Sequence, residues 1–348
     1  MSELNKKIRE LIEKETNAGH FSVLDETSCE LIEQIFDNYQ KMGKIQKVDG
    51  QSSEKLKAEL IFVAAPTGAG KDSLVARLEH QNPEKKYVEL NMDIFRYYFP
   101  KFIEKPEELT DKNFALMTNE FSYEIFATIQ EILLQEFPGT NVIITGTLRE
   151  TDWVEKTFER FKQDEKTDYK VKLACLAVPK KESAISVIQR YIGIINTQKT
   201  RLDAYPGTAR FTSMQYHDET FEKFPTSLEY FQKKLEDEPG KLIDGIEVYR
   251  RGRTAYDLEE DTKVYSSYDM EDTRTALDVV IGLRLKPYQM SNSDILLLIH
   301  RIKENYEYLR AQGTLRETIR DLAIISEHFE TVKRLDKIHS ENDTLDTK

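Results

Sequence analysis

The stretch Leu60-Ile-Phe-Val-Ala-Ala-Pro-Thr-Gly-Ala-Gly-Lys-Asp-Ser73 decides the fold of this chain. Its first five residues are apolar, which is typical of a buried strand, and a glycine-rich turn leads from them into a helical pattern. In this context the backbone N–H groups of the turn can surround phosphates, and the Lys71 side chain can reach the β- and γ-phosphates. The stretch therefore predicts a P-loop, the phosphate-binding turn of nucleotide-binding α/β proteins.

The turn departs from the P-loop pattern G-x-x-x-x-G-K-[ST] at two positions. Ala65 replaces the first glycine, where a methyl group only restricts the turn. Asp72 replaces the hydroxyl residue that usually contacts Mg²⁺, and its carboxylate could either hold the metal directly or repel the phosphates when no metal is present. Ser73 is adjacent, so Asp72 and Ser73 are the candidate Mg²⁺ ligands. The predicted nucleotide-binding residues are Pro66, Thr67, Gly68, Ala69, Gly70, Lys71, Asp72 and Ser73, and the alternative is a turn that binds nothing.

Composition limits the classes of function. The chain has 348 residues, of which 32% are charged, and its formal net charge is −12. An acidic surface argues against a protein that follows the phosphates of a nucleic acid. Of the two cysteines, Cys175 lies in an apolar run and is expected to be inert packing. We see no signal peptide and no stretch of transmembrane length, so we expect a cytoplasmic protein without a membrane partner.

Strand-like apolar runs alternate with helical patterns beyond the P-loop. We predict strands at 60–64, 86–90, 141–145 and 171–178, short strands at 246–249 and 263–266, and helices through residue 80, up to residue 137 and around 153–161. Strands that are apolar on both faces and alternate with helices are typical of a mostly parallel sheet. We therefore predict an α/β fold of the P-loop NTPase type, with helices on both faces of the sheet and extra helices at both termini.

The extra helices set the predicted domain boundaries. Two amphipathic helices precede residue 44, the second opened by a capping box of Thr27 and Glu30, and two more follow residue 291, beginning near Ser293 and Thr314. The predicted divisions are a helical extension and linker at 1–57, the P-loop domain at 58–290, and a C-terminal helical extension at 291–348.

Asp93 follows the second predicted strand, in the run Asn91-Met-Asp-Ile-Phe-Arg96. Ligands of open parallel sheets bind at the carboxyl ends of the strands, so Asp93 could face a γ-phosphate and an acceptor hydroxyl together. A kinase needs a carboxylate there to accept the hydroxyl proton. The alternative is that Asp93 only caps a helix that starts at Ile94.

Thr145, Thr147 and Arg149 follow the third predicted strand and would open toward the same edge of the sheet. Hydroxyls and a guanidinium suit a polar substrate or its phosphates. The alternative is that the threonines are strand formers and that Arg149 is a solvated residue at a helix start.

The order of these segments resembles that of the zeta toxin kinases of bacterial toxin–antitoxin systems. The resemblance runs from Leu60 to Ser267 and rests on the P-loop, the motif N-x-D-x-F-R-x-x-x-P at 91–100, G-T-x-R at 146–149, R-Y at 190–191, T-A-R at 208–210 and H-D at 217–218. Zeta toxins use ATP or GTP with Mg²⁺ to phosphorylate the 3′-hydroxyl of the sugar in UDP-N-acetylglucosamine. The same reaction is what the resemblance implies for this chain.

The resemblance also implies roles for single residues. Lys71 would hold the β- and γ-phosphates, Asp93 would be the general base, and Arg190 with Arg210 would brace the γ-phosphate in the transition state. An arginine so placed can contribute roughly 10³-fold or more to the rate. Lys71, Asp93, Arg190 and Arg210 are therefore the predicted catalytic residues.

The substrate side matches the family less closely. Thr147 corresponds to a family threonine in the substrate cleft, and Arg149 follows at the family's spacing. Thr145 stands where the family usually has a glutamate that fixes the substrate, so an antibiotic, a nucleoside or a dinucleotide is an alternative acceptor. The predicted substrate-binding residues are Asp93, Thr145, Thr147 and Arg149. An alternative of another class is a catalytically weak nucleotide-binding module, whose metal site Asp72 has damaged.

A small helical antitoxin is the partner that the resemblance implies, because such proteins block the nucleotide site of zeta toxins. Residues 1–43 of this chain could also supply such a block in cis, as their amphipathic helices suggest.

Overall fold

A computed structural model of the chain describes residues 2–46, 54–99, 114–180, 182–184, 186–187, 214–251, 263–269 and 271–285. The predicted C-terminal helices, Arg190 and Arg210 lie outside the described residues.

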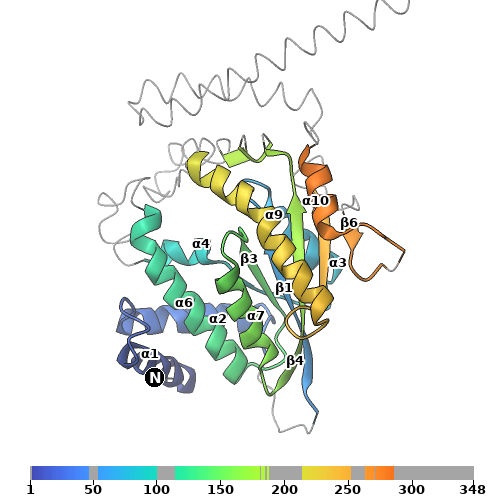
Figure 1. The fold of residues 1–348 in the computed structure, drawn as a ribbon. Helices are drawn as coiled ribbons and strands as arrows, with labels where there is room; N and C mark the ends of the chain where they lie inside the picture. Colours follow the sequence, from blue (N-terminus) through green and yellow to red (C-terminus); the bar gives the residue numbers. More distant parts are fainter. Residues whose placement is uncertain are drawn as a thin grey trace, which may run out of the picture.

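A six-stranded sheet, with strand order β2-β3-β1-β4-β5-β6, forms the centre of the fold. The strands are β1 (Leu56–Ala64), β2 (Val88–Leu90), β3 (Val142–Gly146), β4 (Thr167–Ala177), β5 (Gly245–Arg250) and β6 (Lys263–Ser266). All neighbouring pairs from β2 to β5 are parallel, and only β6 is antiparallel to its neighbour. The sheet thus confirms the predicted mostly parallel α/β fold (Figure 1).

Helices cover both faces of this sheet. They are α1 (Glu3–Asn17), α2 (Glu26–Lys41), α3 (Lys71–Gln81), α4 (Met92–Phe95), the 3-10 helix η1 (Arg96–Tyr98), α6 (Phe114–Glu136), α7 (Thr151–Lys162), α9 (Met214–Asp237) and α10 (Ala276–Leu285). In Figure 1, α6, α7 and α9 lie in front of the sheet and α3 lies behind it. Two hydrophobic clusters match these layers, because α3 packs with one set of strand residues while α6, α7 and α9 pack with the other.

Several predicted boundaries need correction. The central strands β1 and β4 begin four residues earlier than predicted, at Leu56 and Thr167. These first residues pair with each other, since Leu56 lies opposite Thr167 in the parallel register. Helix α2 is capped by Asp25 and not by Thr27. The Asp25 carboxylate accepts from the N–H of Ser28, and the Ser28 hydroxyl lies 3.3 Å from the N–H of Asp25, which completes the capping box.

The two N-terminal helices are part of the main hydrophobic core. Ile8 of α1 and Ile32 of α2 are fully buried in the same cluster as the sheet and α6. The ring of Phe36 stacks on Phe137, with 5.4 Å between the ring centroids. The Tyr39 hydroxyl donates a 3.1 Å hydrogen bond to the carbonyl oxygen of Glu89 in the edge strand β2. The hairpin of α1 and α2 therefore closes one edge of the sheet.

A buried carboxylate on α6 fixes the turn between α1 and α2. Glu124 is 1% exposed, and its two oxygens accept hydrogen bonds from the backbone N–H groups of Ser22, Val23 and Leu24 at 2.7, 3.1 and 3.1 Å. Three backbone donors of the turn are thus satisfied by one side chain.

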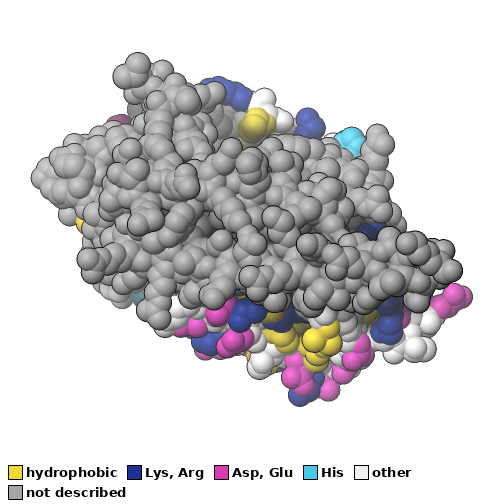
Figure 2. Space-filling view, turned by 90° about the horizontal axis from the view of Figure 1, so that it is seen from above, with side chains coloured by type: hydrophobic (Ala, Val, Ile, Leu, Met, Phe, Trp, Pro, Cys, Tyr) yellow, Lys and Arg dark blue, Asp and Glu magenta, His cyan; other side chains and the backbone are white. Residues whose placement is uncertain are grey.

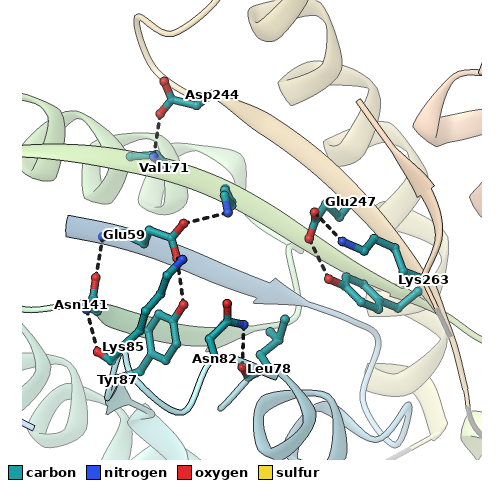
Figure 3. Close-up of polar contacts among 12 residues, drawn as sticks. Glu59, Leu78, Asn82, Lys85, Tyr87, Asn141, Val171, Asp244, Glu247 and Lys263 are labelled. Atoms are coloured by element: carbon teal, nitrogen blue, oxygen red, sulfur yellow. Dashed lines mark hydrogen bonds and ion pairs between the residues drawn. The ribbon is translucent and has the colours of Figure 1, made fainter. Parts of the chain in front are cut away.

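A second carboxylate, Glu59, links β1 to β4 and to the residues just before β2 (Figure 3). Its oxygens contact the ammonium groups of Lys172 and Lys85 at 2.8 and 2.7 Å and the Tyr87 hydroxyl at 2.8 Å. Desolvation opposes ionisation, but these three partners outweigh it and lower the pKa of Glu59 from 4.5 to about 2.

None of the helices in the described ranges is both long and apolar enough to span a membrane.

We expect Glu124→Gln to destabilise the protein by about 2 kcal/mol, because either orientation of the amide turns its NH2 group toward a backbone N–H of residues 22–24. Urea unfolding at neutral pH measures this. Glu120→Gln is the matched control, since Glu120 is exposed on the same helix and accepts a hydrogen bond from the Ser22 hydroxyl instead of from a backbone N–H of residues 22–24. Equal losses in the two variants would contradict the role assigned to Glu124.

The pKa of Glu59 predicts an acid-dependent loss of stability. Because the folded pKa lies below the unfolded value, the contribution is complete above pH 4.5 and disappears as the pH falls toward 2. It amounts to at most about 3 kcal/mol. Urea unfolding of the wild type and Glu59→Gln should therefore differ more at pH 7 than at pH 3. Glu84→Gln, on a neighbouring exposed residue, should follow the wild type at both values.

Candidate functional site

The predicted P-loop lies at the carboxyl end of β1, between β3 and β4. Its first residue is tied to the neighbouring strand, since the N–H of Ala65 donates to the carbonyl oxygen of Gly146 at 3.1 Å. Gly68 and Gly70 have φ angles of +81° and +100°, in the left-handed region that disfavours side chains. Gly70 is the N-cap of α3, so the turn ends with the positive end of the helix dipole at the predicted phosphate site.

Lys71, Asp72 and Ser73 form the first turn of α3. The Lys71 ammonium donates to the carbonyl oxygen of Ala65 at 3.3 Å, so this side chain folds back over its own turn. Asp72 is exposed and Ser73 is half-buried. Burial, and to a smaller extent the Asp72 charge, raises the pKa of Glu89 on β2.

The donor set of this turn fits a metal that is bound mainly through phosphates. Within the described ranges, no group of three or more His, Cys, Asp or Glu side chains could hold an ion on its own. Mg²⁺ usually keeps several water ligands and takes one or two protein oxygens beside those of a nucleotide. One carboxylate and one hydroxyl on the first turn of α3 meet this need.

The segment after β4 lies directly on the P-loop. A Cβ atom added at Gly68 would be 2.2 Å from the carbonyl oxygen of Ser183 and 2.7 Å from Val187 Cγ2. Only a glycine allows the two backbones to come this close. Arg251, which follows β5, contacts the same segment through a 2.7 Å hydrogen bond to the Ser186 hydroxyl.

Ser183, His217 and Asp218 form a chain of contacts. Ser183 Oγ lies 2.7 Å from His217 Nε2, and His217 Nδ1 lies 3.0 Å from the Asp218 carboxylate. The arrangement is similar to a hydrolytic triad, but the Ser183 and His217 side chains are fully buried and Ser183 also contacts the carbonyl oxygen of Lys180 at 2.9 Å. Burial lowers the pKa of His217 in spite of the opposing effect of Asp218. These contacts therefore join α9 to the segment that covers the P-loop.

Asp93 lies in the first turn of the short helix α4, directly after β2. It is not the helix cap, because the Asn91 side chain occupies that role and accepts a 3.0 Å hydrogen bond from the N–H of Asp93. The side chain of Asp93 is 59% exposed. The alternative that Asp93 serves only as a cap is therefore wrong, and its carboxylate lies at the carboxyl edge of the sheet.

Sequence reasoning did not single out the side chains that surround Asp93. Arg96 Nε lies 3.2 Å from Asp93 Oδ1, and the same guanidinium contacts Thr118 Oγ1 and Asn119 Oδ1 on α6 at 3.0 and 2.9 Å. The spacing of Asp93 and Arg96 is a usable signal for the first contact, whereas nothing local to Arg96 indicates the other two.

The end of β3 separates the three predicted substrate residues. Thr145 is 7% exposed, whereas Thr147 is half-buried beyond the last strand residue. Leu148 has a φ of +55°, a strained value for a leucine, and buries its side chain to 2% exposure. This turn separates Thr147 from Arg149, whose guanidinium carbon lies 5.0 Å from the centroid of the Tyr216 ring on α9.

Strand pairing brings the predicted residues to one edge. Leu90 of β2 lies opposite Ile144 of β3, and Gly146 of β3 lies opposite Ala64 of β1. Lys71, Asp93 and Thr147 thus follow three adjacent strands. The view down onto this end of the molecule (Figure 2) shows basic, acidic and apolar side chains of the described residues intermixed along its margin.

Comparisons with known proteins identify the family of this chain. The sequence model of the zeta toxin family matches residues 44–263. A zeta toxin from Streptococcus agalactiae is 29% identical over 224 residues, which cover 62% of this chain and 68% of the relative. A zeta toxin from Enterococcus hirae is 26% identical over 235 residues, or 68% and 72% of the two chains.

A solved structure of the PezAT chromosomal toxin–antitoxin system of Streptococcus pneumoniae has a similar fold. The TM-score is 0.58 at 22% identity, and the match covers 82% of this chain and all of the other. Because the family match extends over more than half of the sequence, this chain belongs to the zeta toxin family.

Proposed function

We propose that the protein transfers the γ-phosphate of ATP or GTP to a hydroxyl group of a small molecule, and that this acceptor is the 3′-hydroxyl of UDP-N-acetylglucosamine. Membership of the zeta toxin family supports a phosphotransferase, and the P-loop supports a nucleoside triphosphate as donor.

The observation that carries the proposal is the placement of Asp93. Asn91 takes over the capping of α4, so the Asp93 carboxylate does not serve that purpose. It stays 59% exposed at the carboxyl end of β2, while Lys71 follows β1 two strands away in the same sheet. A carboxylate and an ammonium at one edge are two of the groups that transfer from a nucleotide to a hydroxyl uses.

In the proposed reaction the turn of residues 66–70 and Lys71 hold the donor phosphates. The acceptor oxygen forms its bond to the γ-phosphorus as the bond to the β–γ bridging oxygen breaks, and Asp93 takes the proton of the acceptor hydroxyl. The diphosphate leaves with the displaced electron pair. Arg190 and Arg210, which lie outside the described residues, are assigned to bracing the γ-phosphate.

Asp72 and Ser73 are the residues that we assign to Mg²⁺, since their side chains start from the first turn of α3. The ion would supply positive charge to the phosphate oxygens during transfer.

Thr147 and Arg149 are assigned to the acceptor, because they follow β3 at the edge shared by Lys71 and Asp93. Thr145 stands where the family usually has a glutamate, and it is buried with a short neutral side chain. It favours a contact with the acceptor that differs from the contact a glutamate would make. An antibiotic, a nucleoside or a dinucleotide as acceptor is therefore the second candidate.

A small helical antitoxin in the cytoplasm is the partner that we propose. The contacts described for α1 and α2 are with each other, with α6 and with β2, and Lys44, which follows α2, pairs with Glu79 near the end of α3 at 3.0 Å. These positions support a structural role for the N-terminal helices rather than a block of the nucleotide site in cis.

We expect Mg²⁺-dependent phosphorylation of UDP-N-acetylglucosamine by ATP, detected by mass spectrometry. Asp93→Asn should lower kcat by about 10²-fold or more while nucleotide binding persists, because only the proton acceptor is removed. Lys71→Ala should abolish both transfer and nucleotide binding.

Three outcomes separate the candidates. ATP consumption with a different phosphorylated metabolite indicates another acceptor, and no Mg²⁺-dependent ATP consumption indicates a binding module without kinase activity. Full turnover by Asp93→Asn removes Asp93 from the role of base. Arg9→Ala, which removes an ion pair with Glu26 on the N-terminal helices, should leave turnover unchanged.

The two glycines of the turn offer a matched pair for the nucleotide site. Both have positive φ, so an alanine at either position costs about 1–2 kcal/mol of backbone strain. Only Gly68→Ala also meets Ser183 and Val187, whereas a Cβ at Gly70 would meet no atom of the described residues within 4 Å beyond its own neighbours in the chain. Thermal unfolding and ATP titration should therefore show a larger loss for Gly68→Ala. A larger loss for Gly70→Ala would contradict the close packing at Gly68.

A further inference from the structure

Arg96 is the buried member of an ion pair with an exposed partner. Its side chain is 7% exposed, whereas that of Asp93 is 59% exposed. Burial of a guanidinium is costly unless its N–H groups are bonded. Here Nε contacts Asp93, Nη1 contacts Thr118, and Nη2 contacts Asn119, all between 2.9 and 3.2 Å.

These contacts tie a weak element to a strong one. Helix α4 has four residues and η1 has three, too few for a helix to be stable by itself. Helix α6 has 23 residues and crosses the core, with Thr118 fully buried near its start. A planar guanidinium bonded in three directions cannot rotate without losing contacts on both elements.

Helix α6 is itself held at this end. Glu124 lies less than two turns beyond Thr118 and binds the backbone of residues 22–24, so the N-terminal turn and α6 are joined. Arg96 thus links the position of the Asp93 carboxylate to the main core of the protein.

We infer that Arg96 is a positioning residue for Asp93. It holds Oδ1 and so fixes the plane and direction in which the carboxylate meets the acceptor hydroxyl. Arg96 touches no reacting atom in this assignment and acts through Asp93 alone. The inference rests on the proposed function, in which Asp93 is the general base.

The kinetics of variants distinguish a positioning residue from a purely structural ion pair. Loss of a positioning residue lowers kcat and leaves the KM values for nucleotide and acceptor nearly unchanged, because binding does not depend on the direction of the carboxylate. Its effect should also vanish once Asp93 can no longer accept a proton, since the two residues act as one unit.

The test is a double-mutant cycle with ATP, Mg²⁺ and UDP-N-acetylglucosamine. Arg96→Ala should lower kcat by about 10- to 100-fold with KM values within about threefold of the wild type. Arg96→Ala combined with Asp93→Asn should be no slower than Asp93→Asn alone. Arg96→Lys should recover activity only in part, because an ammonium group cannot reproduce the three-way contact.

Arg160→Ala is the matched control. Arg160 on α7 makes a two-point contact with Glu131 of α6 at 2.5 and 2.6 Å. Its removal therefore also deletes an arginine contact with α6. This variant should retain the wild-type kcat. If Arg96→Ala does not fold, Thr118→Val combined with Asn119→Leu removes the α6 contacts while keeping the cation, and the same criteria apply.

The outcomes separate the two proposals. No transfer by the wild type means that the proposed function fails. Wild-type transfer with an unchanged kcat in Arg96→Ala, or an equal further loss when Arg96→Ala is added to Asp93→Asn, overturns the positioning role while the kinase assignment stands. Turnover by Asp93→Asn at the wild-type rate overturns both the base and the residue that positions it.

Discussion

The close approach of two backbones at Gly68 is the contact on which the arrangement of the candidate site depends. The segment after β4 reaches the P-loop only because position 68 has no side chain, since a Cβ there would lie 2.2 Å from Ser183. Ser183 in turn contacts His217 of α9. The P-loop therefore packs against the segment after β4, and that segment packs against α9. In the chain, Arg190 closely follows that segment and Arg210 closely precedes α9.

Local patterns predicted most of the fold, and long-range pairing decided the remainder. The apolar runs locate β1, β3 and β4, but the early residues of β1 and β4 alternate between polar and apolar, so no apolar run marks them as strand. They extend the sheet because Leu56 and Thr167 lie opposite each other across 111 positions of sequence. The sequence leaves the cap of α2 ambiguous, because Asp25 and Thr27 both satisfy a capping pattern.

Local sequence patterns likewise predict one part of the candidate site, and long-range contacts decide the other. The P-loop and Asp93 are contiguous with their strands, so sequence alone placed them at the carboxyl edge. Arg96 is separated from its partners on α6 by more than twenty residues of sequence. Hydrophobic periodicity does not predict contacts between residues that far apart in the chain. The burial of Thr145 was equally hidden, since a threonine at a strand end suits either a ligand or a core.

The buried Glu124 has a consequence for the boundaries of the folding unit. The family match begins at residue 44, yet the α6 carboxylate inside that region is satisfied by the backbone of residues 22–24. A fragment cut at the family boundary would keep a buried negative charge and lose its three donors, and it would open the core where Ile8, Ile32 and Phe36 pack. The N-terminal helices therefore complete the core and the polar contacts of the matched region, although they lie outside it.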